Sequence, residues 1–203
     1  PCYAMTQTRR TKSEEARALW QLCFGDTDEF LDRYFDQVYR EEDVLLAEDE
    51  GKAIGHLQFP ELALSLGEAT LPAGYVVAVC THPDHRGKGI MRPLLHEALR
   101  REKARGDVVS VLLPAEEWLY RYYSSTGGYT PVVNRARSSS KDEALGEEDP
   151  AVTASSLVDY LLKVEASQQE PSLLHSRAFW EVITEDFERD EDLVLQIHRT
   201  ESG

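Results

Sequence analysis

The chain has 203 residues with 37 acidic and 22 basic side chains, which gives a formal net charge of −15. Proteins that bind phosphate backbones usually carry a basic balance, so this charge argues against general nucleic-acid binding. Seven basic and two acidic residues nevertheless fall between Arg86 and Arg105, a local charge of +5 that leaves −20 for the rest of the chain. We call residues 86–105 the basic segment, and its role has to be explained.

The composition is that of a globular protein, with 41% hydrophobic and 29% charged residues. No apolar run approaches the roughly 20 residues that cross a membrane, and residues 1–12 lack the apolar core of a secretory signal. The three cysteines, at positions 2, 23 and 80, fit a reducing compartment better than a disulfide framework. We therefore expect a cytoplasmic protein without membrane association.

The first half of the chain alternates helical and strand patterns. Thr11 and Glu14 have capping-box spacing ahead of an apolar helical stripe that ends at Cys23, and a second such stripe begins at Asp28. Strands are predicted at 44–47, 53–59 and 62–66, with turns at 49–52 and near Gly67. Residues 75–81, YVVAVCT, form a continuous apolar run typical of a strand buried on both faces.

A glycine-containing turn follows that strand at residues 86–91, RGKGIM. It leads into a helix with its apolar residues on one face, in which Pro93 fits only the first turn. A second buried strand, VVSVLL, is predicted at 108–113. Strand, turn, helix and strand form a βαβ unit, so the two strands should be parallel or splayed neighbours.

The composition changes beyond residue 133. Serines and acidic residues up to Pro150 are typical of a linker, and amphipathic helices are predicted at 155–168 and 172–188, ahead of a strand at 193–198. We divide the chain into a domain at 1–133, an acidic and serine-rich linker or loop at 134–154, and a helical segment with a final strand at 155–203.

The glycine turn has the chemistry of a phosphate site. A helix N-terminus presents free N–H groups and the positive end of a dipole, and Gly87 and Gly89 remove the Cβ atoms that would obstruct it. Arg86 and Lys88 add positive charge. A P-loop spacing is absent, and a Rossmann fingerprint would need glycine where Arg92 stands.

The pattern Q/R-x-x-G-x-G/A does fit, through Arg86, Gly89 and, less closely, Met91, and it resembles the acetyl-CoA site of the GNAT acyltransferase superfamily. Residues 114–129, PAEEWLYRYYSSTGGY, resemble the strand, short helix and closing Y-x-x-x-G-[FY] segment of that family. The resemblance covers residues 10–133. It implies an α/β (α+β) GNAT fold, with a mixed and mostly antiparallel central sheet, splayed parallel strands and flanking helices.

The resemblance also implies how acetyl-CoA would bind. The pantetheine would lie against the main chain of the strand before the glycine turn, at Val77, Ala78, Val79 and Cys80. The pyrophosphate would be held by the N–H groups of the turn, at Arg86, Gly87, Lys88, Gly89, Ile90 and Met91. Arg92 is a candidate for one more phosphate contact, whereas the remaining positive charges are predicted to form a solvated helix face, at Arg100, Arg101, Lys103 and Arg105.

The implied reaction is acetyl transfer to a primary amine by direct attack within a ternary complex. Backbone N–H groups of residues 77–80 could polarise the thioester. Tyr123 is our choice of proton donor, with Tyr122 and Ser124 left open because Tyr123 precedes Tyr129 by six residues where the family pattern expects five. The general base is left open among a water chain and four side chains, those of His56, His82, Glu116 and Glu117. Residues 80–85 lack the ligand pairing of a metal site, so no metal is expected.

Residues 157–187 are similar to the connector of tandem GNAT proteins of the enhanced-intracellular-survival type. On that reading, residues 155–203 would begin an incomplete second GNAT-like half, and the chain would be a truncated or atypical member. We expect a small-molecule or protein amine as partner, with a homo-oligomer left open. The alternatives are a non-catalytic CoA-binding module for sensing or assembly, and a purely structural interaction protein.

Overall fold

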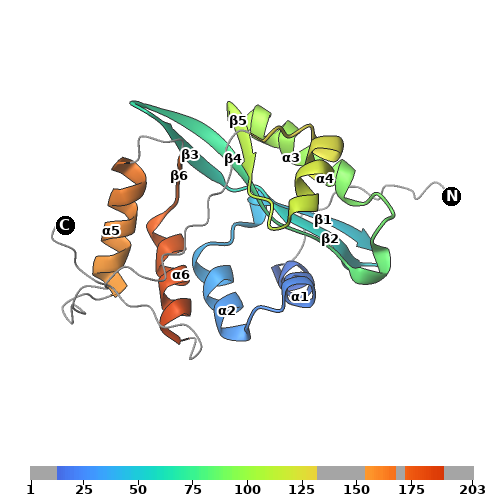
Figure 1. Ribbon diagram of the computed structural model, residues 1–203. Helices are drawn as coiled ribbons and strands as arrows, with labels where there is room; N and C mark the ends of the chain where they lie inside the picture. Colours follow the sequence, from blue (N-terminus) through green and yellow to red (C-terminus); the bar gives the residue numbers. More distant parts are fainter. Residues whose placement is uncertain (1–12, 132–153, 168–171, 190–203) are drawn as a thin grey trace.

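A computed structural model describes residues 13–131, 154–167 and 172–189 (Figure 1). Its elements are, in chain order, α1 (Ser13–Phe24), α2 (Asp28–Gln37), the short 3-10 helix η1 (Glu41–Asp43), β1 (Val44–Asp49), β2 (Lys52–Gln58), β3 (Glu61–Leu66), β4 (Ala69–Thr81), η2 (Pro83–His85), α3 (Met91–Arg105), β5 (Val109–Leu112), α4 (Glu117–Gly127), α5 (Ala154–Ser167), β6 (Ser172–Leu174) and α6 (Arg177–Arg189). The mixed, mostly antiparallel sheet with flanking helices confirms the predicted fold class.

β1 and β2 form the hairpin predicted around residues 49–52. Asp49 pairs with Lys52, and the two residues between them, Glu50 and Gly51, have φ angles of 49° and 80°. Two consecutive positive φ angles give a type I′ turn, whose twist matches that of antiparallel strands.

β4 is the central strand, and its two edges are covered differently. Gln58 of β2 lies opposite Val77, and Glu61 of β3 lies opposite Gly74 in the same antiparallel register, so β2 and β3 follow one edge of β4 in succession. On the other edge, β5 runs parallel to β4, as predicted, and pairs only with residues 73–76. Beyond Val76 β5 no longer accompanies β4, which leaves an open edge beside residues 77–81.

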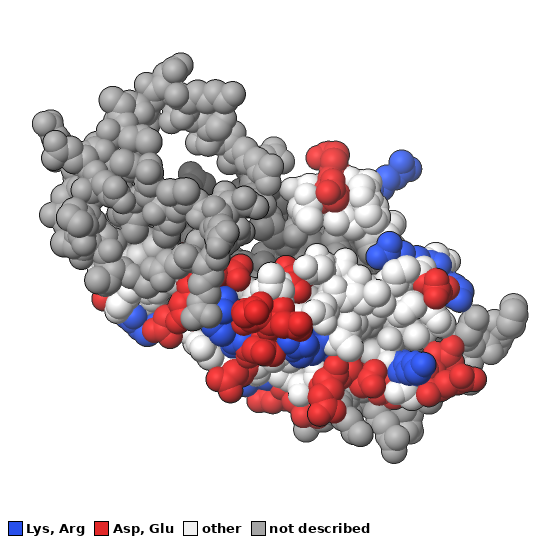
Figure 2. Space-filling view, turned by 90° about the horizontal axis from the view of Figure 1, so that it is seen from below, with Lys and Arg blue, Asp and Glu red and all other residues white. Residues whose placement is uncertain are grey.

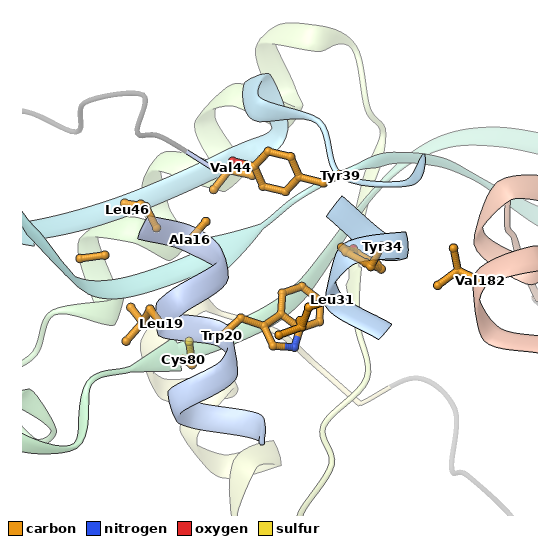
Figure 3. Close-up of a cluster of buried hydrophobic side chains, with 11 residues drawn as sticks. Ala16, Leu19, Trp20, Leu31, Tyr34, Tyr39, Val44, Leu46, Cys80 and Val182 are labelled. Atoms are coloured by element: carbon orange, nitrogen blue, oxygen red, sulfur yellow. The ribbon is translucent and has the colours of Figure 1, made fainter. Parts of the chain in front are cut away.

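The sheet lies between two layers of helices, with α1 and α2 on one side and α3 and α4 on the other (Figure 1). Consecutive strand residues point to opposite faces, so Val44 and Leu46 pack in the cluster with α1 and α2, whereas Leu45 packs in the cluster with α3 and α4. Figure 3 shows the first cluster, in which Trp20 of α1 lies beside Leu31 of α2.

Two predicted boundaries were wrong. β4 begins at Ala69, six residues before the predicted start, because residues 69–74 pair with β3. The predicted helix at 172–188 starts late, because Ser172–Leu174 is extended and pairs with β3. The helix α6 begins only at Arg177, where the Ser176 hydroxyl oxygen accepts from the N–H of Phe179 at 3.2 Å and caps it.

The C-terminal helices pack directly on the first part of the chain. Val182 of α6 is 1% exposed and belongs to the cluster that contains Leu31 and Tyr34, and Arg33 of α2 forms ion pairs with Glu185 and Asp186. The three-part division of the chain stays a prediction, because residues 134–153 of the predicted linker and the strand predicted at 193–198 lie outside the described residues. None of the described helices has the length and apolarity needed to cross a membrane.

Candidate active site

A β-bulge lies on the open edge of β4. Two steps along β2, from His56 to Gln58, correspond to three steps along β4, from Cys80 to Val77. The extra residue is accommodated at Ala78, which has a φ of 52°. Bulges bend a strand and turn its peptide groups out of the regular ladder. Residues 77–80, the predicted site of the pantetheine, therefore form an irregular stretch of β4 that does not pair with β5.

The glycine turn follows directly from this strand. φ is positive at Gly87 (73°) and Gly89 (75°) and negative at Arg86, Lys88 and Ile90. A Cβ atom at either glycine would meet nothing within 4 Å, so the backbone conformation and not the available space requires glycine there. Successive N–H groups on a backbone that alternates in this way form concave sites suited to anions.

The N-terminus of α3 lacks both the side-chain cap and the acidic first turn that commonly satisfy the first N–H groups of a helix. Its N-cap residue, Ile90, makes no side-chain cap, and its first turn contains no acidic residue, whereas Thr27 caps α2 ahead of Asp28 and Glu29. Within the described residues Arg86 and Lys88 form no ion pair, and both are exposed. No acidic side chain of the described residues therefore pairs with the charges at this turn.

The apolar side chains of the turn pack against the protein, whereas its arginines make polar contacts at the surface. Met91, the poorest match to the family pattern, is 4% exposed and lies in the core with α3 and α4, so its side chain points away from the turn. Ile90 packs on β2, where a Cβ at Gly55 would lie 2.8 Å from its Cγ2 atom. The guanidinium of Arg86 donates from Nε to the main-chain carbonyl oxygen of Thr81 at 3.2 Å. The guanidinium of Arg92 makes a long contact of 3.5 Å to the main-chain carbonyl oxygen of Ser125 in α4.

Tyr123 lies on α4, is 8% exposed and packs in the cluster with β4 and α3. Burial, together with the neighbouring Tyr122 and Cys80 groups, raises the pKa of Tyr123 to about 12, so its phenol stays protonated at neutral pH. Tyr122 is half-buried, and burial also raises its pKa. Ser124 is exposed. Gly128 ends the helix in the left-handed conformation.

The side chains left open as a general base lie in different settings. His56 has no exposed surface, and burial lowers its pKa to about 4. His82 is half-buried at the start of η2, where its Nδ1 accepts from the N–H of Asp84 at 3.3 Å. Glu116 and Glu117 are exposed at the start of α4. A general base must contact the acceptor amine, and His56 has no exposed surface through which an amine could reach it, which argues against His56 in that role.

Cys80 is buried beside Cys23 of α1. The Cys23 thiol donates to the Thr81 oxygen at 3.6 Å. Burial, with a contribution from Cys23, raises the pKa of Cys80, so its thiol is protonated and a poor nucleophile. The described residues contain no group of three or more His, Cys, Asp or Glu side chains that could hold a metal ion.

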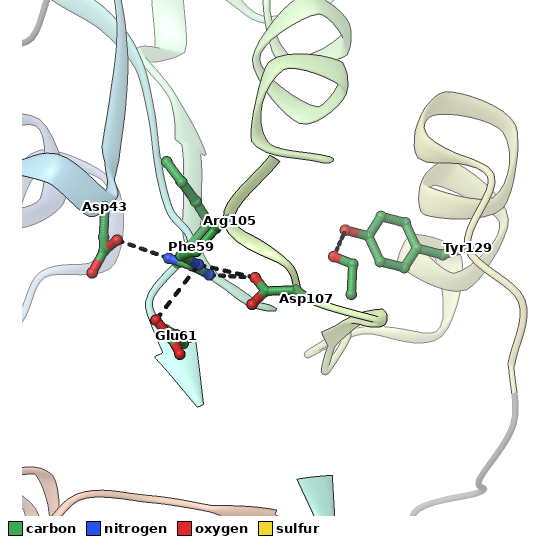
Figure 4. A network of polar contacts seen from close by, with 7 residues as sticks. Asp43, Phe59, Glu61, Arg105, Asp107 and Tyr129 are labelled. Carbon is green, nitrogen blue, oxygen red and sulfur yellow. Dashed lines mark hydrogen bonds and ion pairs between the residues drawn. The ribbon is translucent and has the colours of Figure 1, made fainter. Parts of the chain in front are cut away.

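The prediction that the C-terminal end of the basic segment is a solvated helix face was wrong for Arg105. Arg100 and Lys103 are exposed as predicted, and Arg100 and Arg101 both contact Glu97. The Arg105 side chain is only 22% exposed and binds Asp107 at 2.6 Å and Asp43 at 3.0 Å, over the ring of Phe59 (Figure 4). Arg105 thus joins α3 to the strands instead of facing solvent.

Acidic side chains gather on the face of the molecule that carries α1 and α2, which Figure 2 shows from below. We call this face the acidic surface and define it by the exposed carboxylates of the two helices, those of Glu14, Asp28, Glu29, Asp32 and Asp36. α1 contacts β4 directly. The acidic surface therefore lies on the outer side of the helix layer that packs against the sheet (Figure 1).

The sequence analysis missed the bulge at Ala78 and the contact that His56 makes with it. The Nδ1 atom of His56 lies 2.8 Å from the Ala78 oxygen. No residue type announces this arrangement, because alanine rarely takes a positive φ and a histidine on a strand is most often a local hydrogen-bonding group. The apolar run that contains residues 77–80 predicted a strand, not its irregularity.

Comparison with known proteins agrees with this geometry. The family model described as an acetyltransferase (GNAT) domain matches residues 5–131. A protein of Streptomyces avermitilis named as an uncharacterized N-acetyltransferase is 32% identical over 76 residues, which are 37% of this chain and 18% of that protein.

Two solved structures share the fold. Eis1 from Mycobacterium abscessus has a TM-score of 0.65 at 17% identity, over 91% of this chain and 48% of its own. The aminoglycoside 6'-N-acetyltransferase AAC(6')-IG from Acinetobacter haemolyticus has a TM-score of 0.52 at 19% identity, over 64% of this chain and 92% of its own. The chain thus spans less than half the length of the Streptomyces and Mycobacterium proteins, and the likeness of residues 157–187 to a tandem-GNAT connector stays a prediction. The family model covers more than half of the chain, which therefore belongs to the GNAT acetyltransferase family.

Proposed function

We propose that this protein is an N-acetyltransferase that transfers the acetyl group of acetyl-CoA to a primary amine by direct attack. The observation that carries the proposal is the succession of an open, bulged strand edge at residues 77–81 and an uncapped helix N-terminus beyond the glycine turn. The first offers main-chain groups to the pantetheine and thioester. The second offers N–H groups and positive charge to the pyrophosphate.

The proposed chemistry forms a bond between the amine nitrogen and the acetyl carbon and breaks the bond from that carbon to sulfur. N–H groups of β4 would stabilise the negative charge that develops on the carbonyl oxygen. Tyr123 is protonated at neutral pH, as a phenol is even at its ordinary pKa of 10, and burial raises this pKa to about 12; it would give its proton to the departing thiolate and regain one from water. The proton released by the amine would pass to water, so no side chain is assigned as base.

The acceptor is proposed to be a cationic amine. The acidic surface lies over α1 and α2, the helices on one side of the sheet (Figure 1), and would attract such a molecule before the reacting nitrogen loses its proton. AAC(6')-IG, which shares the fold, is named for an aminoglycoside. Polyamines, aminoglycosides and basic protein tails share the required charge and reactive group.

Tyr123→Phe tests the assignment of the proton donor, with Tyr122→Phe as the matched control. We expect the first change to lower kcat by about 10²-fold or more, in the range of a lost general acid, and to leave acetyl-CoA binding by calorimetry within about threefold. The assay is release of CoA thiol with a panel of amines. An unchanged kcat in Tyr123→Phe with a low one in Tyr122→Phe would move the role to Tyr122.

The same assay separates the enzyme from the alternatives. Acetyl-CoA that binds but releases no thiol with any amine of the panel would favour a CoA-binding module for sensing or assembly. Absence of binding would favour an interaction protein and overturn the proposal.

A further inference from the structure

His56 of β2 is a fixed hydrogen-bond donor to the bulge in β4. Its side chain is completely buried, and its Nδ1 atom lies 2.8 Å from the Ala78 oxygen. A carbonyl oxygen can only accept, so Nδ1 carries the hydrogen. Burial keeps the ring neutral, with a pKa of about 4, and this leaves Nε2 as an acceptor.

Two further side chains hold the ring in this orientation. The amide nitrogen of Gln58 lies 3.5 Å from Nε2 of His56, a long contact. The Tyr34 hydroxyl donates to the amide oxygen of Gln58 at 2.9 Å, which directs the amide nitrogen toward the imidazole. The Trp20 ring covers the imidazole, with centroids 6.0 Å apart. The donor on His56 is therefore set by a connected network and not by its own torsion angles alone.

The accepting residue is strained. In the described part of the chain, Ala78 and the hairpin residue Glu50 are the non-glycine residues with positive φ. A conformation of this kind persists only when the surrounding contacts enforce it. The hydrogen bond from His56 is such a contact, because it holds the carbonyl of the strained residue itself.

The same bond orients the N–H group of the next residue. The described chain has no cis peptide bond, and in a trans peptide the C=O and N–H groups point in opposite directions. The Ala78 carbonyl points toward the His56 imidazole, which lies on the α1 side of the sheet beside Trp20, so the N–H of Val79 points away from that imidazole. Val79 lies in the part of β4 beyond Val76, where β5 no longer pairs with the strand.

We propose that His56 is a positioning residue for acetyl transfer, because it holds the Ala78–Val79 peptide with the Val79 N–H directed at the carbonyl oxygen of the thioester. This inference rests on the proposed function. It names the donor that would stabilise the developing negative charge and the side chain that fixes its direction. Such a donor acts mainly on the transition state, so its loss should lower kcat more than it weakens binding.

Two substitutions at position 56 test the proposal. His56→Asn places an amide nitrogen near the position of Nδ1 and can still donate to Ala78, whereas His56→Leu has a similar volume and no donor. Removal of an oxyanion donor costs about 10²- to 10³-fold in kcat. His56→Leu leaves the N–H present but not held, so we expect its kcat to fall by about 10- to 100-fold, with the Kd for CoA changed by less than about threefold.

The controls separate positioning from general destabilisation. His56→Asn should recover most of kcat, and Val158→Ala, a change at a buried residue of α5 outside the cluster that contains Trp20 and Tyr34, should lower the melting temperature without lowering kcat. All assays are run below the melting temperature, with the active fraction taken from the stoichiometry of CoA binding. The inference would be overturned if the kcat of His56→Leu stayed within about threefold of that of the parent chain. It would also be overturned if His56→Leu and His56→Asn lost kcat equally.

Amide NMR distinguishes failure of this inference from failure of the proposed function. The Val79 amide signal should shift in His56→Leu and stay near its original position in His56→Asn. If the parent chain transfers no acetyl group but the Val79 signal behaves in this way, the proposed function is wrong and the positioning contact stands. If the signal is unmoved in His56→Leu, the contact does not set the orientation, whatever the activity.

Discussion

A single buried imidazole makes the stability of this protein depend on pH. The pKa of His56 is lowered from 6.5 to about 4 by burial, so between these values the unfolded chain binds a proton that the folded chain does not. The unfolded state is therefore favoured as pH falls from 6.5, and the loss is complete only below about 4. The gap between the two pKa values corresponds to about 3 kcal/mol.

We expect urea denaturation at a series of pH values to show this loss in the parent chain. His56→Asn cannot titrate, so the difference in its free energy of unfolding from the parent should change by about 3 kcal/mol between pH 7 and pH 4. The carboxylates titrate in both proteins, so their contribution to the pH dependence cancels when the two free energies of unfolding are subtracted. A constant difference across this range would mean that the folded protein accepts the proton at His56 as readily as the unfolded chain does.

Positive φ angles could be predicted at some residues and not at others. Gly87 and Gly89 could be read as a special turn because glycine is the residue that takes positive φ without strain. Ala78 takes a positive φ too, but only because tertiary contacts enforce it, so its residue type carries no signal. Met91 matches the family pattern poorly, and its side chain points into the core instead of toward the turn.

At the scale of elements, Arg105 fastens the end of α3 to the sheet. Its guanidinium contacts Asp107 just before β5 and Asp43 just before β1, and its Nη1 donates to the Phe59 oxygen between β2 and β3 (Figure 4). The Asp107 side chain is only 2% exposed. Removing the cation would leave a buried carboxylate without its counter-charge, which costs far more than the loss of a surface pair.

Arg105→Met should therefore lower the free energy of unfolding by about 3 kcal/mol. Arg100→Met is the matched control on the same helix. Arg100 is 67% exposed, and among the described residues its ion pair is with Glu97, so its loss should cost less than about 1 kcal/mol. Urea denaturation of both variants at pH 7 measures the contrast, and equal losses would show that burial does not strengthen the Arg105 contacts.

Elements with strong local patterns were predictable, and those that depend on distant partners were not. The hairpin at residues 49–52, the helix from Asp28 and the parallel pairing of β4 with β5 follow from local sequence and were confirmed. Ser172–Leu174 was assigned to the helix that follows it, yet it pairs with the edge of β3. Ser176 was the available signal, since serine is a favoured N-cap.

At the scale of the whole molecule, charge is divided between two places. Arg86 and Lys88 at the glycine turn form no ion pair with any described residue, whereas the acidic surface covers α1 and α2 (Figure 2). The net charge of −15 argued against nucleic acid but concealed both features. A chain with this distribution can attract a cationic acceptor through its overall field and still bind an anionic co-substrate through local N–H groups and side chains.

This division predicts how the reaction responds to salt. The Debye length falls from about 30 Å at 0.01 M to about 8 Å at 0.15 M ionic strength, which screens the acidic surface from an approaching acceptor. For a triamine such as spermidine we expect kcat/KM to fall by about tenfold over this range, and for a monoamine to fall much less, because attraction grows with the charge of the acceptor. Replacing Glu29 and Asp36, both exposed on α2, by Lys should flatten the response to the triamine while the Kd for CoA stays the same. An equally steep response in that variant would place the attraction elsewhere on the molecule.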